Sequence, residues 1–193
     1  MPAKFKAGTA MPQMKLAKVG GGTAEIGGKR DKWQLVVIYR GLHCPLCKRY
    51  LSTLNDLAED FQAINTDVVA VSADPKEKAE TEKQELALDF DVAYDLSQDQ
   101  MRTLGLYISN PRSPQETDRP FAEPGVFIIN PEGNAQVIDV SNAPFARPDL
   151  NSLLNGLKFV QEKGYPARGT ADHQCGRHFS PAKPQFAISG ILQ

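Results

Sequence analysis

Two cysteines separated by two residues, Cys44 and Cys47 in Cys-Pro-Leu-Cys, are the residues of this chain best suited to chemistry. They lie between a β-branched, apolar run over 34–39, typical of a buried strand, and apolar residues at helical spacing that predict a helix over 45–62. If Cys44 is the N-cap residue, Pro45 takes the first helical position and Cys47 the third. Unpaired backbone N–H groups and the helix dipole lower the pKa of a thiol there. The spacing therefore predicts a reactive thiolate and a pair that can close a disulfide.

Two other interpretations of this cysteine pair remain open. The cysteines could be small buried hydrophobic residues, or they could be half of a zinc site. Zinc would need two more ligands, and the candidate donors are His43, His173, Cys175 and His178. A Cys-x-x-Cys between a buried strand and a helix is more typical of thiol redox chemistry.

Composition restricts the possible partners and compartment. The 193 residues include 22 Lys and Arg against 23 Asp and Glu, a formal charge of −1, and the basic residues are scattered. This pattern disfavours nucleic-acid binding. The longest apolar run, 35–39, is too short to span a membrane, and the first residues are not followed by the apolar segment of a secretion signal. We therefore expect a cytoplasmic protein with no nucleic-acid or membrane partner, and no cofactor or metal.

The remaining patterns predict an α/β fold. Residues 1–30 are rich in glycine and predict at most a hairpin, and 106–124 predict a long loop. Further strands are expected over 67–72, 92–94, 125–129 and 135–139, the last two as a hairpin. Further helices are expected from Asp74-Pro75 to 88, from Ser97 to 104 and from Pro148 to 163.

This order of elements predicts the architecture. Two β-α-β crossovers followed by an antiparallel hairpin give a mixed sheet with helices on both faces. No internal repeat or second core is evident, so we expect a single domain over 1–193 with an irregular tail over 164–193.

Three segments match a known family. They are Phe5 to Pro12 with Leu16, the strand-to-cysteine segment 36–47, and the late strand and turn Pro124 to Gly133. In these segments the chain resembles the peroxiredoxin-like (AhpC/TSA, redoxin) branch of the thioredoxin-fold superfamily, over roughly Phe5 to Val160. The resemblance implies a thioredoxin-like three-layer fold with a central mixed β-sheet flanked by helices.

The resemblance also implies a function, the reduction of hydroperoxides by a redox-active cysteine pair. One thiolate of Cys44 and Cys47 would attack the hydroperoxide to give a sulfenic acid, and the other sulfur would condense with it to form a disulfide. An external thiol reductant, such as a thioredoxin- or glutaredoxin-type donor, would regenerate the pair. A homodimer is compatible with this resemblance.

Two relatives in the superfamily assign the cysteine roles differently. The peroxiredoxin pattern Pro-x-x-x-Thr-x-x-Cys places the attacking position on Cys47, with Cys44 at the threonine position and Arg40 at the proline position. The thioredoxin pattern Cys-x-x-Cys makes Cys44 the attacking residue. Which cysteine attacks first therefore stays open at this point.

Peroxide chemistry also needs a cation to stabilise the thiolate and the charge that develops on oxygen. Arg40, just before the cysteines, is the first candidate and Arg119 the second. Pro124 stands where peroxiredoxins usually carry an arginine, and it resembles the cis-proline of thioredoxins. We expect a site of Cys44, Cys47, Arg40 and Pro124, with His43 a lesser candidate for modulating the thiolate pKa.

A third cysteine and two rival functions complete the expectations. Cys175 lies at a separation from Cys47 that is similar to that of the distal resolving cysteine in some peroxiredoxins, and it could resolve across a dimer. Because a Cys-x-x-Cys contains its own resolving cysteine, a non-essential thiol is favoured there. The rivals are a thioredoxin-like protein-disulfide reductase and, less favoured, a non-catalytic thioredoxin-fold binding module.

Overall fold

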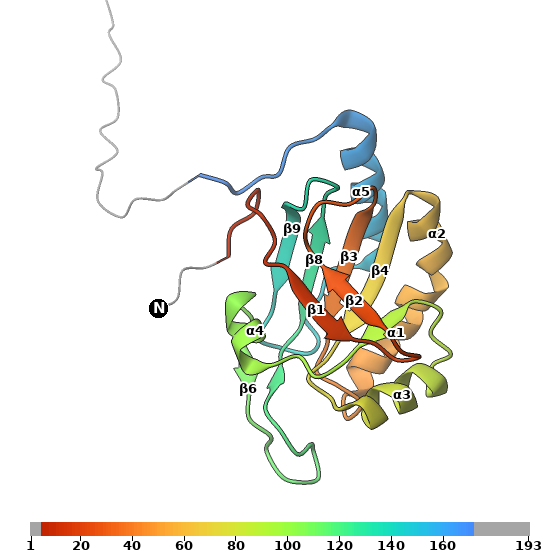
Figure 1. The fold of residues 1–193 in the computed structure, drawn as a ribbon, viewed down its shortest axis with the longest axis vertical. Coiled ribbons are helices and arrows are strands. Elements are labelled where there is room, and N and C mark those ends of the chain that lie inside the picture. The colour runs from red at the N-terminus through yellow and green to blue at the C-terminus, as the bar shows by residue number, and fades with distance from the viewer. Residues whose placement is uncertain (1–4, 172–193) are drawn as a thin grey trace, which may run out of the picture.

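The central strand is β3 (Trp33–Ile38), whose apolar run leaves Leu35 to Ile38 buried. In the computed structural model, which describes residues 5–171, β3 lies in the middle of a five-stranded sheet of order β5-β4-β3-β8-β9 (Figure 1). β4 (Thr66–Val71) pairs parallel with β3, and β5 (Asp91–Ala93) pairs parallel with β4. β8 (Gly125–Ile129) and β9 (Ala135–Val140) form the antiparallel hairpin. The predicted mixed sheet is confirmed.

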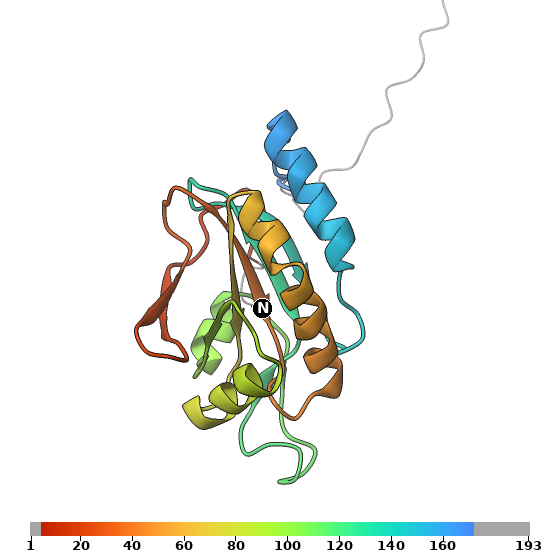
Figure 2. The same ribbon diagram turned by 90° about the vertical axis from the view of Figure 1, so that its right-hand side faces the viewer.

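Helices cover both faces of this sheet, as Figure 2 shows. α1 (Pro45–Asp56), α2 (Ala58–Ala63) and α5 (Leu150–Lys163) pack on one face and share a core cluster with both cysteines. α3 (Lys76–Glu85) contributes Ala79 to that cluster. The hairpin of β1 (Met14–Ala17) and β2 (Thr23–Ile26), together with α4 (Gln98–Thr103), closes the other face.

The helix expected over 45–62 is two helices. The backbone at Leu57 leaves helical geometry, with φ −104° and ψ 1°, and its N–H bonds the carbonyl of Leu54 instead of continuing the ladder. α2 follows directly after this break, and its Ala58 and Phe61 pack into the core. Helical spacing alone does not show this break, because apolar residues recur on both sides of it.

Two short strands lie in the segment expected to be a loop. β6 (Ile108–Ser109) and β7 (Phe121–Ala122) pair antiparallel, and each is only two residues long. Such strands are too short to show an alternating pattern in sequence. The expected start of α4 at Ser97 is confirmed, and the side chain of Gln100 completes a capping box there.

The chain ends supply no further regular element within the described residues. Residues 164–171 contain no helix or strand, and 172–193 lie outside the described part of the chain. The single-domain organisation over 1–193 stays a prediction. No helix within residues 5–171 has the length and apolar character needed to cross a membrane.

Candidate active site

The turn between β3 and α1 sets the position of the first cysteine. Gly41 has φ +129°, and a Cβ there would lie 2.5 Å from the carboxylate of Asp74. That carboxylate accepts the N–H of Leu42 at 2.7 Å, and the N–H of Cys44 donates to the carbonyl of Gly41 at 3.0 Å. A residue with a side chain would therefore strain this turn and displace Asp74. Glycine here allows the chain to bring Cys44 to the start of α1.

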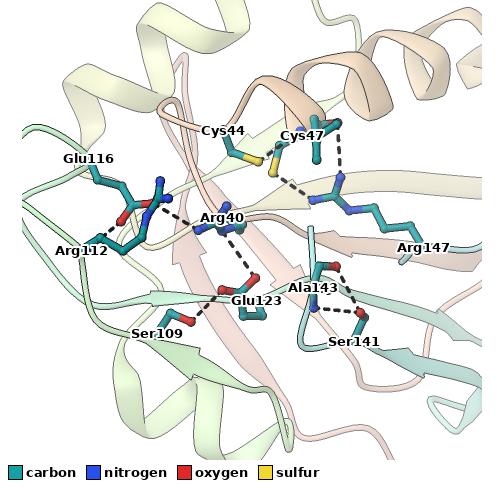
Figure 3. Close-up of polar contacts among 11 residues, drawn as sticks. Arg40, Cys44, Cys47, Ser109, Arg112, Glu116, Glu123, Ser141, Ala143 and Arg147 are labelled. Atoms are coloured by element: carbon teal, nitrogen blue, oxygen red, sulfur yellow. Dashed lines mark hydrogen bonds and ion pairs between the residues drawn. The ribbon is translucent and has the colours of Figure 1, made fainter. Parts of the chain in front are cut away.

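Cys44 is the N-cap residue of α1, as the sequence predicted. Its Sγ accepts the backbone N–H of Cys47 at 3.3 Å, and Pro45 follows at the first helical position. Both thiols are free, with residue exposures of 1% for Cys44 and 0% for Cys47. The N-terminus of the helix therefore directs a backbone donor at one sulfur and places the second sulfur beside it (Figure 3).

Arg147 is a functional candidate that sequence reasoning missed. Its Nη2 lies 2.9 Å from the Sγ of Cys47, and its Nη1 donates to the carbonyl of Leu46 at 3.3 Å. The guanidinium also lies over the ring of Tyr50, 5.2 Å from its centroid. The Tyr50 hydroxyl in turn donates to the carbonyl of Pro148 at 3.0 Å, which ties α1 to the segment that carries the arginine. A fork-shaped cation is thus held against the cysteine pair.

Only one weak signal in the sequence points to Arg147. The signal is that an arginine stands just before Pro148 and the last helix. Arg147 is separated from Cys47 by 100 positions in the sequence. α5 and the segment before it run alongside α1 in the folded protein, which brings the guanidinium to the sulfur (Figures 2 and 3). No local sequence pattern predicts a contact between residues so far apart.

The two thiols have different proton affinities. A hydrogen bond from the Cys47 thiol is the main cause that lowers the pKa of Cys44 to about 6, and the Cys47 backbone N–H and the charges of Arg147 and Arg40 act in the same direction against burial. Burial first, and then the hydrogen bond with Cys44, raise the pKa of Cys47, although Arg147 opposes them. At neutral pH the pair therefore holds one negative charge, mainly on Cys44, and one proton, on Cys47.

This arrangement predicts an unusual thiol titration. Because the thiolate forms on deprotonation, the ultraviolet thiolate absorbance of the reduced protein should rise with increasing pH, with a midpoint of about 6. Loss of that transition in Cys44→Ser would assign it to Cys44. A single transition near the ordinary cysteine value, about 8.5, would contradict the assignment.

Arg40 and Arg119, the cations expected from the sequence, are occupied by carboxylates. Arg40 lies 3.3 Å from Glu116 and 3.4 Å from Glu123, both with buried side chains (Figure 3). Its guanidinium also lies over the ring of Phe121. Arg119 pairs with Asp95 and Asp118. Arg40 still helps to lower the pKa of Cys44, after Arg147 in size. Because Glu116 and Glu123 offset much of the Arg40 charge, the electrostatic effect of Arg40 on the Cys44 thiolate is reduced.

The remaining expected residues take structural positions. The peptide bond before Pro124 is trans, so its likeness to a cis-proline is wrong. The trans bond continues the extended chain from β7 into β8, and an extended residue before proline is the sterically preferred form. The His43 ring packs against Phe121, with centroids 4.8 Å apart, and burial, followed by the charge of Arg40, lowers the pKa of His43. His43 is therefore neutral at pH 7.

The zinc-ligand and distal-cysteine candidates near the C-terminus lie outside the part of the chain that the structure describes. His173, Cys175 and His178 lie outside the described residues. Within residues 5–171, no group of three or more His, Cys, Asp or Glu side chains is arranged to hold a metal ion.

Two hollows open beside the cysteine pair. One of about 460 Å³ is lined by Leu46, Tyr50, Phe145, Arg147 and Pro148. A smaller one of about 260 Å³ lies against Leu42 and His43. Neither hollow is lined by a cysteine, but the first is lined by Arg147, which contacts the Cys47 sulfur, and the second by His43, which precedes Cys44 in the sequence.

Comparison with known proteins identifies a family. The model of the AhpC/TSA family matches residues 7–138. A search of curated proteins finds no match.

Solved structures share the fold. A peroxiredoxin-like protein from Aquifex aeolicus has a TM-score of 0.70 at 20% identity, with 81% of this chain and 88% of that chain covered. A reduced 2-Cys peroxiredoxin from Plasmodium vivax has a TM-score of 0.67 at 17% identity, covering 83% and 100%. AhpC from Mycobacterium tuberculosis has a TM-score of 0.68 at 16% identity, covering 87% and 99%. The fold is therefore the expected thioredoxin-like, three-layer one.

Proposed function

This chain belongs to the AhpC/TSA family and is a thiol-dependent peroxidase, and on that premise we propose that it reduces hydroperoxides with Cys44 as the attacking thiolate and Cys47 as the resolving thiol. The observation that carries the proposal is the asymmetric cysteine pair at the start of α1. Cys44 carries the charge, while Cys47 keeps its proton and contacts Arg147.

The proposed reaction has two steps. The Cys44 thiolate attacks the nearer oxygen of the hydroperoxide, the O–O bond breaks, and the leaving alkoxide or hydroxide takes up a proton. Cys44 is then a sulfenic acid. The Cys47 sulfur attacks the sulfenic sulfur, an S–S bond forms, and the hydroxyl group leaves with the Cys47 proton as water. Arg147 supports the negative charge at the sulfurs during both steps.

Burial of the sulfurs favours a small substrate over the rival one. With exposures of 1% and 0%, the two cysteines are buried, and a hydroperoxide needs a smaller opening than a folded protein does to reach their sulfurs. A disulfide on another folded protein would need direct access to the Cys44 sulfur. This contrast supports the peroxidase over the protein-disulfide reductase.

The donor that reduces the enzyme disulfide belongs to the same proposal. A dithiol of the thioredoxin or glutaredoxin type can attack the Cys44–Cys47 disulfide and leave both cysteines reduced. Pairing of two chains is a further part of the proposal, and the chemistry described needs residues of one chain only.

A single-turnover experiment tests the proposed function. We expect one equivalent of hydrogen peroxide to remove two thiols from the reduced protein, at Cys44 and Cys47, much faster than it oxidises free cysteine. Peptide mapping by mass spectrometry identifies the disulfide. A rate no faster than that of free cysteine, together with fast reduction of a protein disulfide, would favour the reductase instead.

A further inference from the structure

The guanidinium of Arg147 makes its contacts with one short stretch of α1. Its Nη1 donates to the carbonyl of Leu46 at 3.3 Å, and its Nη2 lies 2.9 Å from the Sγ of Cys47. The ring of Tyr50 is the third contact, with its centroid 5.2 Å from the guanidinium carbon. Tyr50 follows Cys47 by three positions, so both side chains lie on the same side of the helix.

Tyr50 contacts both Arg147 and the residue after it. Its ring lies under the guanidinium, and its hydroxyl donates to the carbonyl of Pro148 at 3.0 Å. Tyr50 and Arg147 are both half-buried, and a cation over an aromatic ring is held more firmly where water is partly excluded. One side chain of α1 therefore fixes the segment that carries the arginine and also the arginine itself.

The way Arg147 is held differs from the way Arg40 is held. Arg40 lies 3.3 Å from Glu116 and 3.4 Å from Glu123, so carboxylates fix its position and also offset its charge. Within residues 5–171, Arg147 has no ion pair with a carboxylate; its partners there are the carbonyl, the sulfur and the ring. An aromatic ring attracts a cation through its quadrupole and carries no net charge.

The charged groups around Tyr50 leave its ring neutral. Burial is the main cause that raises the pKa of Tyr50; Asp139 and Asp149 act in the same direction, and Arg147 opposes them. At neutral pH the side chain is therefore a phenol and not a phenolate. The Asp149 carboxylate is used elsewhere, since it accepts the N–H of Ser152 at 2.7 Å at the start of α5. The positive charge of Arg147 stays available to the sulfurs.

We propose that Tyr50 is a positioning residue for the peroxide reaction: its ring holds the Arg147 guanidinium against the cysteine pair without offsetting the positive charge. When the Cys44 thiolate attacks, negative charge moves from sulfur to the leaving oxygen. A cation that is already in place stabilises this charge without having to be ordered during the reaction. Tyr50 forms and breaks no bond and acts only through Arg147. This inference rests on the proposed function.

Replacing Tyr50 tests the role of the ring. In Tyr50→Leu the second-order rate with hydrogen peroxide should fall by about tenfold, because Arg147 is no longer held at the sulfur. The midpoint of the thiolate absorbance should move above about 6, since the charge of Arg147 helps to lower the pKa of Cys44. Tyr50→Phe keeps the ring, so its midpoint should be native and its rate within about threefold of native. Equal losses in Tyr50→Leu and Tyr50→Phe would overturn the proposal.

A double variant shows whether Tyr50 acts through Arg147. If it does, adding Tyr50→Leu to Arg147→Gln should cause no further loss of rate and no further shift of the thiolate midpoint. The same tenfold loss in the presence and absence of Arg147 would show two independent effects and would overturn the proposal.

Two further variants control for damage to the fold. Tyr94, which follows β5, packs against the same core cluster but is not a contact of Arg147, so Tyr94→Leu should keep the native rate and midpoint. If Tyr50→Leu does not fold, Tyr50→Met removes the ring but fills the space with a flexible apolar chain, and the same results are expected.

The outcomes separate this inference from the proposed function. A native rate and midpoint in the folded variant without the ring would overturn the inference while the peroxidase stands. Failure of the native protein to form a Cys44–Cys47 disulfide with hydrogen peroxide would overturn both.

Discussion

Replacing Cys44 with serine is expected to slow the reaction with hydrogen peroxide by at least about 10³-fold, because the attacking thiolate is lost and a serine hydroxyl is not ionised at neutral pH. Cys47→Ser should behave differently. Cys44 remains at the helix N-terminus, so it should still react once, lose one thiol and stop at the sulfenic acid, since no resolving thiol is left. Stopped-flow kinetics and trapping of the sulfenic acid with a dimedone-type reagent measure both effects.

The two cysteine variants control for each other. Circular dichroism and thermal unfolding should show that both fold, because serine is close to cysteine in size. A fast reaction in Cys44→Ser and a slow one in Cys47→Ser would exchange the two roles. If both variants keep turning over peroxide, the cysteine pair is not the catalytic centre.

Removing the guanidinium of Arg147 is expected to have the next largest effect. In Arg147→Gln the second-order rate with peroxide should fall by about 10²- to 10³-fold, because the cation beside the sulfurs no longer supports the negative charge. Arg147→Lys should fall between this variant and the native protein. Lysine keeps a charge but cannot contact the Cys47 sulfur and the Leu46 carbonyl through one planar group.

A neighbouring arginine provides the control for this prediction. Arg49 is exposed in the first turns of α1, so Arg49→Gln changes the net charge by the same amount near the same helix end. Its rate should stay within about threefold of the native one, since an exposed charge is screened by solvent. An equal loss in Arg49→Gln and Arg147→Gln would show that general charge matters rather than the contact with Cys47.

The position of Arg147 changes the interpretation of Arg40. Both arginines lower the pKa of Cys44, but Arg40 is held by Glu116 and Glu123, so much of its charge is compensated within the protein. Arg147 instead has a sulfur, a backbone carbonyl and an aromatic ring as its contacts. The cation that the chemistry needs therefore comes from the segment before the last helix.

The parts of the fold and site that depend on neighbouring residues were predictable from the sequence. The buried strand β3 and the hairpin of β8 and β9 follow from residue periodicity and turn residues. The N-cap position of Cys44 follows from Pro45 and the helical spacing after it. Capping, propensity and spacing act over a few residues, so a short stretch of sequence contains the information that determines them.

Tertiary packing alone decided the rest of the site. Arg147 contacts Cys47 because α5 and the segment before it run alongside α1. The two residues are 100 positions apart, so residue spacing does not predict this contact. The Tyr50 ring lies against the same guanidinium for the same reason, whereas in the sequence Tyr50 is only one apolar residue at helical spacing. The charge that an arginine supplies to a thiolate, and the proton affinity of a thiol, depend on distance and on exclusion of water. The distances between these groups and their burial are set only when elements distant in sequence pack together.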